Sequence, residues 1–204
     1  MPVIVLAGGR SMRMGRPKAL LQWPGSTRSF VTHVTDTLRN AGATCVGVVT
    51  GAHHDLITST LADEPVQVLY NPRHDEGQLA SLLHGLRWAF AQTDGAWVMS
   101  TLVDVPGVRV DTVRAIADAT RAGHVLAVRP RHGDRHGHPV VWRREVLPLL
   151  EAADPSQGAR LVMRALALDG RVRDVDVDDP GVLTDVDTPA QYDALAAGRP
   201  VRDD

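Results

Sequence analysis

Glycines and cationic side chains are concentrated in one short stretch near the N-terminus, residues 8–18. This stretch follows the apolar run Val3–Ala7, which has the length and the β-branched content of a buried strand. The glycines let backbone N–H groups approach an anion closely, and the Arg and Lys side chains add forked and point-charge donors. A polyphosphate requires these properties, so we expect the loop to wrap the triphosphate of a nucleotide.

Three aspartates near the ends of predicted elements supply the opposite charge. Asp104 follows a predicted strand at 96–101, and Asp185 and Asp187 precede the last predicted helix. Taken alone, these residues are also typical of turns and helix caps. Mg²⁺, however, takes one or two carboxylates from a protein and shares its other positions between water and substrate phosphates. Acidic residues from two loops and one cationic loop together indicate a phosphoryl or nucleotidyl transfer site.

Strand and helix patterns alternate along the first two thirds of the chain. Apolar runs predict strands at 3–7, 45–50, 66–70, 96–101 and 125–128. Apolar residues at helical spacing predict helices at 26–41, 55–61, 77–91 and 110–122. This order favours βαβ units and a mostly parallel α/β sheet, in which ligands bind at the carboxyl ends of the strands. We therefore expect one crevice, formed by loops 8–18, 71–77 and 102–106.

The remainder of the chain is less regular. Residues 129–139 are rich in Gly, His and Arg and are predicted to form a turn. Further patterns predict strands at 140–142 and 172–177, helices at 145–152 and 159–168, and a short helix that begins at Pro189. No repeat or linker is evident, so we expect one domain over residues 1–197. Residues 129–180 would elaborate the sheet edge, and residues 198–204 would form a frayed tail.

The composition argues against several classes of protein. The net charge of -2 and the pI near 6.5 give no overall attraction to nucleic acid, and the aromatic content of 4% gives no stacking platform. No apolar run approaches the ~20 residues that a membrane span requires, and no signal peptide is recognisable. The single cysteine, Cys45, cannot form an internal disulfide, so we expect a reducing, cytoplasmic location.

Other motifs for phosphate, metal or nucleophile chemistry do not match. Gly9 and Gly15 have the wrong spacing for a Walker A loop, and Lys18 is followed by Ala19 rather than by Ser or Thr. The Rossmann G-x-G-x-x-G and the hydrolase G-x-S-x-G patterns do not occur. Histidines cluster at 53–54 and at 132–138, but the second cluster lies in a Gly-rich turn without cysteine, so zinc is not favoured.

The chain also resembles a known family. Residues 6–18 read Leu-Ala-Gly-Gly-Arg-Ser-Met-Arg-Met-Gly-Arg-Pro-Lys, which is similar to the L-A-[AG]-G-x-S-x-R-M-G-x-x-K signature of MobA/MocA-like nucleotidyltransferases that act on the molybdenum cofactor. Later blocks follow in the family's order: Asn71-Pro72, Glu76-Gly77, Ser81-Leu82, Gly85-Leu86, Asp104-x-Pro106, Gly137-His138-Pro139, Gln157-Gly158-Ala159-Arg160 and residues 185–189. The resemblance therefore covers nearly the whole chain.

The resemblance implies a fold and a reaction. The fold would be a Rossmann-like, three-layer α/β/α domain of the nucleotide-diphospho-sugar transferase type. The reaction would be Mg²⁺-dependent transfer of NMP from CTP or GTP to a phosphomonoester, with molybdopterin first among the acceptors, and would release pyrophosphate. Arg13, Lys18 and Asp104 would be catalytic. Asp104 and Asp185 would hold the metal, with Asp187 ranked after Asp185.

The resemblance also implies the binding residues and partners. The nucleotide would be bound by Leu6, Ala7, Gly8, Gly9, Arg10, Ser11, Arg13, Gly15, Lys18, Asn71, Gly77 and Ser81. The acceptor would be bound by His138, Gln157 and Arg160. The product would be delivered by docking to a molybdoenzyme or its chaperone, with no nucleic acid and no membrane involved.

Two departures from the family pattern leave the base open. Gly8 stands where the cytidylyl branch usually has Ala, while Leu-Ala-Gly-Gly is typical of the guanylyl branch. The missing methyl is expected to leave room beside the base for a purine. The sequence Leu-Val-Asp-Val-Pro at 102–106 matches neither branch. Two alternatives also stay open: a sugar-1-phosphate or other phosphometabolite as the acceptor, and a non-catalytic nucleotide-binding regulatory or chaperone module. The joint presence of Arg13, Lys18, Asp104 and Asp185 argues against the second.

Overall fold

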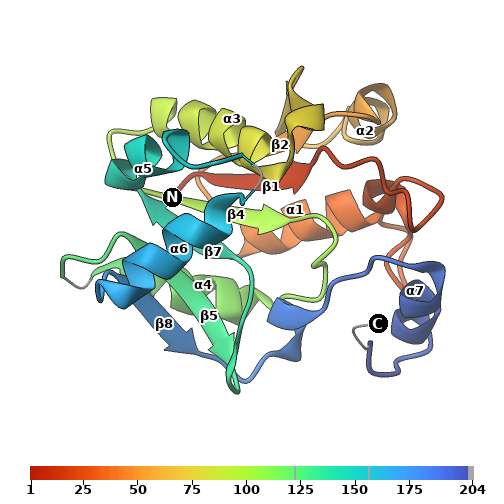
Figure 1. Cartoon of the computed structure of the whole chain (residues 1–204). Coiled ribbons are helices and arrows are strands. Elements are labelled where there is room, and N and C mark those ends of the chain that lie inside the picture. The colour runs from red at the N-terminus through yellow and green to blue at the C-terminus, as the bar shows by residue number, and fades with distance from the viewer. Residues whose placement is uncertain (122, 156, 202–204) are drawn as a thin grey trace.

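The computed structural model describes residues 1–121, 123–155 and 157–201. Within this part of the chain, an eight-stranded sheet lies between two layers of helices (Figure 1). The strands are β1 Val3–Ala7, β2 Val46–Thr50, β3 Gln67–Tyr70, β4 Trp97–Leu102, β5 Ala127–His132, β6 Arg135–His136, β7 Val140–Arg143 and β8 Val172–Asp176. The helices are α1 Phe30–Asn40, α2 His54–Thr60, α3 Gln78–Ala91, α4 Val110–Asp118, α5 Leu147–Glu151, α6 Ala159–Leu168 and α7 Pro189–Ala196.

The sheet is mostly parallel, as the sequence predicts. Its order is β3-β2-β1-β4-β7-β5-β6, and β8 pairs with β5. The β1–β2, β1–β4, β2–β3 and β5–β8 pairs are parallel, whereas β7 pairs antiparallel with both β4 and β5. The expectation that residues 129–180 form an elaboration over the sheet edge is wrong. Three strands of that region extend the sheet itself, and β7 lies between β4 and β5.

Strand β1 divides the core into its two halves. Because successive side chains of a strand point to opposite faces, Val3, Val5 and Ala7 join one apolar cluster and Ile4 and Leu6 join the other. The first cluster includes α1 and α4, and the second includes α3, α5 and α6. These layers cover both faces of the parallel strands, which explains why the strands read as continuous apolar runs.

Several helix and strand boundaries differ from the expected ones, for reasons of local hydrogen bonding. Helix α1 begins after Ser29, whose hydroxyl accepts from the Thr32 N–H at 3.3 Å, rather than after Ser26 or Thr27. The preceding residues form a hairpin-like bridge, Gln22 with Ser29, that delays the helix. The predicted turn at 129–139 is partly strand, since β5 continues to His132 and pairs with β6. Of the tail, residues 202–204 lie outside the described residues, so its fraying stays a prediction.

Three short 3-10 turns follow the parallel strands and bring further residues to the carboxyl edge of the sheet: η1 Lys18–Leu20, η2 His74–Glu76 and η5 Pro180–Leu183. Two others, η3 Ala119–Arg121 and η4 Arg144–Val146, lie at the opposite edge, where the Arg144 N–H donates to the Ala96 carbonyl at 2.8 Å. The C-terminal segment, including α7, lies beside the N-terminal loop in Figure 1, and the Tyr192 hydroxyl donates to the Gln22 carbonyl at 2.9 Å. No helix in the described ranges is long and apolar enough to cross a membrane.

Gly85 sets how closely α3 approaches the sheet. A Cβ at this position would lie 2.6 Å from Ile4 Cδ1 and 2.8 Å from Val49 Cγ2, two fully buried side chains. We expect Gly85→Ala to lower the free energy of unfolding by about 1–3 kcal/mol, because overpacking a tight core outweighs the better helix propensity of Ala. Urea denaturation measures this. The control is Ser59→Ala on the exposed face of α2, which gains propensity without a clash; equal stability changes in both variants would contradict the prediction.

Candidate active site

The loops after β1 and β4 emerge side by side because these strands are parallel neighbours, with Leu6 opposite Leu102. The loop after β1 returns to the same edge through η1, which carries Lys18. A third segment joins them, because the Val186 N–H donates to the Asp104 carbonyl at 2.9 Å. Three regions far apart in sequence therefore meet at the carboxyl end of the central strands, where an α/β sheet binds its ligands.

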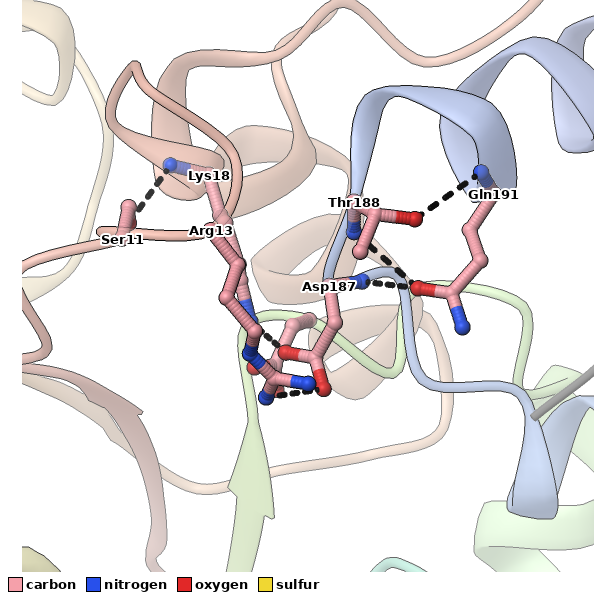
Figure 2. Close-up of polar contacts among 7 residues, drawn as sticks. Ser11, Arg13, Lys18, Asp187, Thr188 and Gln191 are labelled. Atoms are coloured by element: carbon pink, nitrogen blue, oxygen red, sulfur yellow. Dashed lines mark hydrogen bonds and ion pairs between the residues drawn. The ribbon is translucent and has the colours of Figure 1, made fainter. Parts of the chain in front are cut away.

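Two cations and two carboxylates face one another at this point (Figure 2). The Lys18 ammonium lies 2.7 Å from Asp104 Oδ2 and also donates to Asp187 Oδ1. Arg13 Nη2 lies 2.6 Å from the other oxygen of Asp187. We call these four residues the charge cluster. It brings together the three predicted catalytic residues, Arg13, Lys18 and Asp104, with Asp187.

The charge cluster is partly withdrawn from water. The Lys18 side chain is only 12% exposed, whereas that of Arg13 is 71% exposed. Burial alone would lower the pKa of Lys18, but Asp104 and Asp187 outweigh it and raise that pKa above its ordinary value. Burial likewise acts to raise the pKa of Asp187, and the adjacent Lys18 and Arg13 lower it overall. Lys18 and Asp187 are consequently charged at neutral pH.

Backbone turns hold the cationic loop in shape. Ser11 has a positive φ of 54°, and its carbonyl accepts from the N–H groups of Met14 and Gly15 at 3.1 and 3.0 Å. Its hydroxyl accepts from the Lys18 N–H at 3.1 Å, which fixes the start of η1. Met14 is buried in the core and anchors the loop. These contacts aim the Lys18 side chain at the two aspartates.

A capping box determines which aspartate faces Lys18. The Thr188 hydroxyl accepts from the Gln191 N–H, and the Gln191 side chain accepts from the N–H groups of Asp187 and Thr188 at 2.8 and 3.0 Å. Because Thr188 caps α7, the Asp187 carboxylate is left to pair with Lys18 and Arg13 (Figure 2). Asp185, the preferred second metal ligand from the sequence, is exposed. Asp187 is thus the acidic residue of this segment that pairs with Lys18 and Arg13, while the ranking of the two carboxylates as metal ligands stays a prediction.

A cavity of about 280 Å³ opens beside the charge cluster. Of the residues expected to bind the nucleotide, its lining includes Leu6, Ala7, Gly8, Gly9, Ser11, Lys18, Gly77 and Ser81, together with Asp104. Arg10, Arg13, Gly15 and Asn71 lie outside that lining. The cavity is also lined by His53, His74 and Gln78, which were not predicted from the sequence. His53 and His74 come a few residues after the ends of β2 and β3, and this position was a signal that could have identified them; Gln78 begins α3.

An ion pair crosses from the cationic loop to η2. Arg10 Nη2 lies 2.8 Å from Asp75 Oδ1, and His74 Nδ1 lies 3.0 Å from the same oxygen. His53 Nε2 is 3.3 Å from the Arg10 carbonyl oxygen. Arg10 therefore ties two walls of the cavity together instead of pointing into it. Within the described ranges, no three His, Cys, Asp or Glu side chains are grouped as a metal centre.

His138, one of the predicted acceptor residues, lies within electrostatic range of Asp104 and Arg160. The loop that carries His138 is pinned to η5, since the His138 N–H donates to the Val182 carbonyl at 3.0 Å and a Cβ on Gly137 would lie 1.9 Å from that oxygen. His138 Nδ1 is buried and has no hydrogen-bond partner among the described residues. Burial lowers the pKa of His138 to about 4; Asp104 opposes this shift and Arg160 adds to it. Arg160 and Gln157 are both exposed.

Comparison with known proteins identifies the relationship. Residues 3–172 match the family model described as the MobA-like NTP transferase domain. The chain belongs to the MobA-like NTP transferase family. The resemblance noted in the sequence is confirmed, and so is the prediction of a nucleotidyltransferase enzyme at the level of this family.

The relatives that this chain matches are named for different activities. A probable molybdenum cofactor guanylyltransferase of Mycobacterium marinum is 30% identical over 94% of this chain and 90% of its own length. Nicotine blue oxidoreductase of Paenarthrobacter nicotinovorans is 29% identical over 92% of each chain. The crystal structure of Rv0371c from Mycobacterium tuberculosis has a TM-score of 0.81 and 27% identity, and covers 97% of this chain and 98% of its own. A second structure of Rv0371c, at a TM-score of 0.73, is a complex with manganese and covers 96% and 97% of the two chains.

Gly8 of this MobA-like transferase does not simply leave room beside a base. A Cβ on Gly8 would lie 3.2 Å from Ser81 Oγ, and 3.7 Å from the backbone carbon of Thr50. Ser81 Oγ in turn accepts from Asn71 Nδ2 at 3.1 Å. A methyl group at position 8 would therefore press on the Ser81 hydroxyl. The expectation that the missing methyl leaves room for a purine stays a prediction.

His138 should make the stability of this MobA-like transferase pH-dependent. Its folded pKa of about 4 lies below the ordinary value of 6.5, so between these values the unfolded chain binds the additional proton. Stability that is present above pH 6.5 is lost as the pH falls toward 4, by up to about 3 kcal/mol. Urea denaturation across this range measures the loss in the wild type and in His138→Gln, which cannot titrate.

The difference between the two proteins isolates His138. Burial also lowers the pKa values of His33 and His84, but these residues titrate in both proteins. We expect a shallower loss of stability in His138→Gln. The same pH dependence in both proteins would contradict the assignment.

Proposed function

We propose that this MobA-like transferase transfers GMP from GTP to the terminal phosphate of molybdopterin and releases pyrophosphate. A phosphate oxygen of the acceptor attacks the α-phosphorus, and the bond from that phosphorus to the bridging α–β oxygen breaks. The observation that carries the proposal is the charge cluster beside the cavity, because it supplies both the cations that a triphosphate needs and the carboxylates that a divalent metal needs.

The two aspartates fit a divalent metal. Asp104 and Asp187 both reach the Lys18 ammonium, so their carboxylates already converge on one cation. Two carboxylates from the protein match the requirement of Mg²⁺, and a related structure contains manganese. We propose Asp104 and Asp187 as the residues that hold Mg²⁺, which when bound neutralises charge on the triphosphate. Asp185 becomes the second choice for this role.

The cationic loop would position and stabilise the phosphates. Lys18 offers a compact charge with three donors, and Arg13 offers a planar fork that suits phosphate oxygens. The backbone of Gly9 and the turn at Ser11 line the same cavity and add neutral donors. Such preformed donors stabilise the charge that develops on the leaving pyrophosphate, while binding aligns the two reactants. Little covalent chemistry is left for the protein.

The acceptor would enter from the side of His138. Its Nδ1 is buried without a partner in the described ranges, and a buried polar atom of this kind is costly unless a ligand satisfies it. Arg160 is exposed nearby and could pair with the acceptor phosphate. Gln157 lies in the loop just before α6, the helix that carries Arg160, and we propose it as a further contact.

The relatives support GTP as the donor. Several are named molybdenum cofactor guanylyltransferase, and the Leu-Ala-Gly-Gly sequence at 6–9 is typical of that branch. CTP, a sugar-1-phosphate acceptor and a non-catalytic regulatory module stay as alternatives. A cytoplasmic location and docking to a molybdoenzyme or its chaperone are part of the same proposal.

The proposal is tested with a matrix of the four NTPs against molybdopterin and several sugar phosphates, with pyrophosphate as the readout. We expect pyrophosphate release with GTP and molybdopterin. In Asp104→Asn the rate of this release should fall at least about 100-fold, because a ligand of the metal and a partner of Lys18 are removed. Circular dichroism checks that the variant is folded. Undiminished turnover in Asp104→Asn would refute the role of this carboxylate.

Other outcomes of the matrix point to other functions. Tight NTP binding without pyrophosphate release from any acceptor would favour the regulatory module. Turnover of nicotine blue, without pyrophosphate release, would favour the type of reaction named for the P. nicotinovorans relative.

Base preference should respond to Gly8 through Ser81. We expect Gly8→Ala to change the ratio of kcat/KM for GTP and CTP, because its methyl lies 3.2 Å from Ser81 Oγ and must displace it. In a Ser81→Ala background that hydroxyl is absent. The effect of Gly8→Ala on the ratio, expressed as a free-energy difference, should then be less than about half of its effect in the wild-type background. Additive effects in the double variant would mean that residue 8 acts on the base directly.

A further inference from the structure

Lys18 is the only lysine in the chain. Of the 22 Lys and Arg residues, the other 21 are arginines. The two side chains differ physically, because an ammonium is a compact, strongly hydrated point charge while a guanidinium is a planar, delocalised fork. Of the two, the ammonium is the closer analogue of a small metal ion. The only ammonium side chain of the sequence, that of Lys18, thus lies where two carboxylates converge.

The contacts of Lys18 are those expected of a bridging cation. Its Nζ lies 2.7 Å from Asp104 Oδ2 and also contacts Asp187 Oδ1, so it links carboxylates from loops that are far apart in sequence. The second Asp187 oxygen is occupied by Arg13 at 2.6 Å. Both carboxylates are therefore neutralised within the protein before any ligand arrives.

This neutrality opposes the entry of a free divalent cation. The charge cluster holds two positive and two negative side chains, so an incoming dication would have to take both carboxylates from Lys18 and one from Arg13. The Lys18 side chain is 12% exposed, and like charges a few ångströms apart repel strongly away from bulk water. A triphosphate changes this balance, because its oxygens receive the displaced ammonium and guanidinium.

We propose that Lys18 occupies the place of the metal in the ligand-free protein, so that the site takes a metal–triphosphate complex as one ligand and excludes the free metal. The inference rests on the proposed function, since it concerns the same metal and nucleotide. Lys18 moves from the carboxylates to the phosphates when this complex binds, and Asp104 and Asp187 then hold the metal. By linkage, metal and triphosphate each raise the affinity of the protein for the other by the same factor.

The single lysine makes the exchange directly observable. Protein that is labelled with ¹⁵N,¹³C-lysine gives one side-chain Nζ signal in NMR, because only Lys18 carries the label. We expect Mg²⁺ alone to leave this signal in place. Mg²⁺ together with a GTP analogue that has a methylene bridge between the α- and β-phosphorus atoms should shift it. A shift of equal size with Mg²⁺ alone would overturn the proposal.

Metal affinity provides the second measurement. Calorimetry with Mn²⁺, in the absence of nucleotide, should show binding at least about tenfold tighter in Lys18→Met than in the wild type, because the competing cation is gone. Arg16→Met is the matched control. It removes one positive charge from the same loop, but its guanidinium lies over the Tyr192 ring, 5.3 Å from the centroid, and not on the carboxylates. This control should bind Mn²⁺ as the wild type does.

The outcomes separate this inference from the proposed function. Equal Mn²⁺ affinity in the wild type and Lys18→Met would overturn the inference, even where GTP and molybdopterin yield pyrophosphate. A gain as large in Arg16→Met would also overturn it, because the effect would then be one of net charge. Mn²⁺ binding that needs the nucleotide analogue, together with no pyrophosphate from any acceptor, would support the inference and refute the proposed transfer reaction. The NMR measurement on the wild type keeps the test decisive if Lys18→Met does not fold.

Discussion

The bridge from Lys18 to Asp104 and Asp187 is the interaction on which the architecture of the site depends. It joins the loop after β1, the loop after β4 and the segment before α7, which the parallel sheet alone would leave as three separate loops. Two carboxylates this close repel each other unless a cation lies between them. The fold therefore assembles the site around a positive charge, which Lys18 supplies.

The supporting contacts are arranged to keep the bridge in place. Ser11 fixes the start of η1 on one side, and the capping box of Thr188 and Gln191 fixes Asp187 on the other. Neither depends on a ligand. The precision of the site thus comes from backbone turns and caps, while the sheet provides the common edge on which they meet.

The early part of the fold could be predicted because local patterns and topology agree there. Apolar runs identified β1 to β4, and the rule that parallel strands end at one edge brought Lys18 and Asp104 together. Strand β7 was predicted at 140–142, but its antiparallel position between β4 and β5 was not, because no local pattern encodes the order of strands in a sheet. The pairing of Asp187 with Lys18 and Arg13 was not predicted either, since it depends on Thr188 rather than Asp187 capping α7. His53 and His74 were not predicted as site residues, because only the folded structure brings them together in the lining of one cavity.

The segment 179–187 has a consequence for where this domain can be cut. Asp179 accepts from the Arg109 N–H and from the Thr112 hydroxyl, which tethers the segment to the start of α4. Val182 secures the His138 loop, and Asp187 completes the charge cluster. The match to the family model nevertheless ends at residue 172. A truncated protein that stops at this boundary would retain the signature loop and still lack half of the carboxylates that face Lys18, so the end of the family-model match is not the boundary of the working unit.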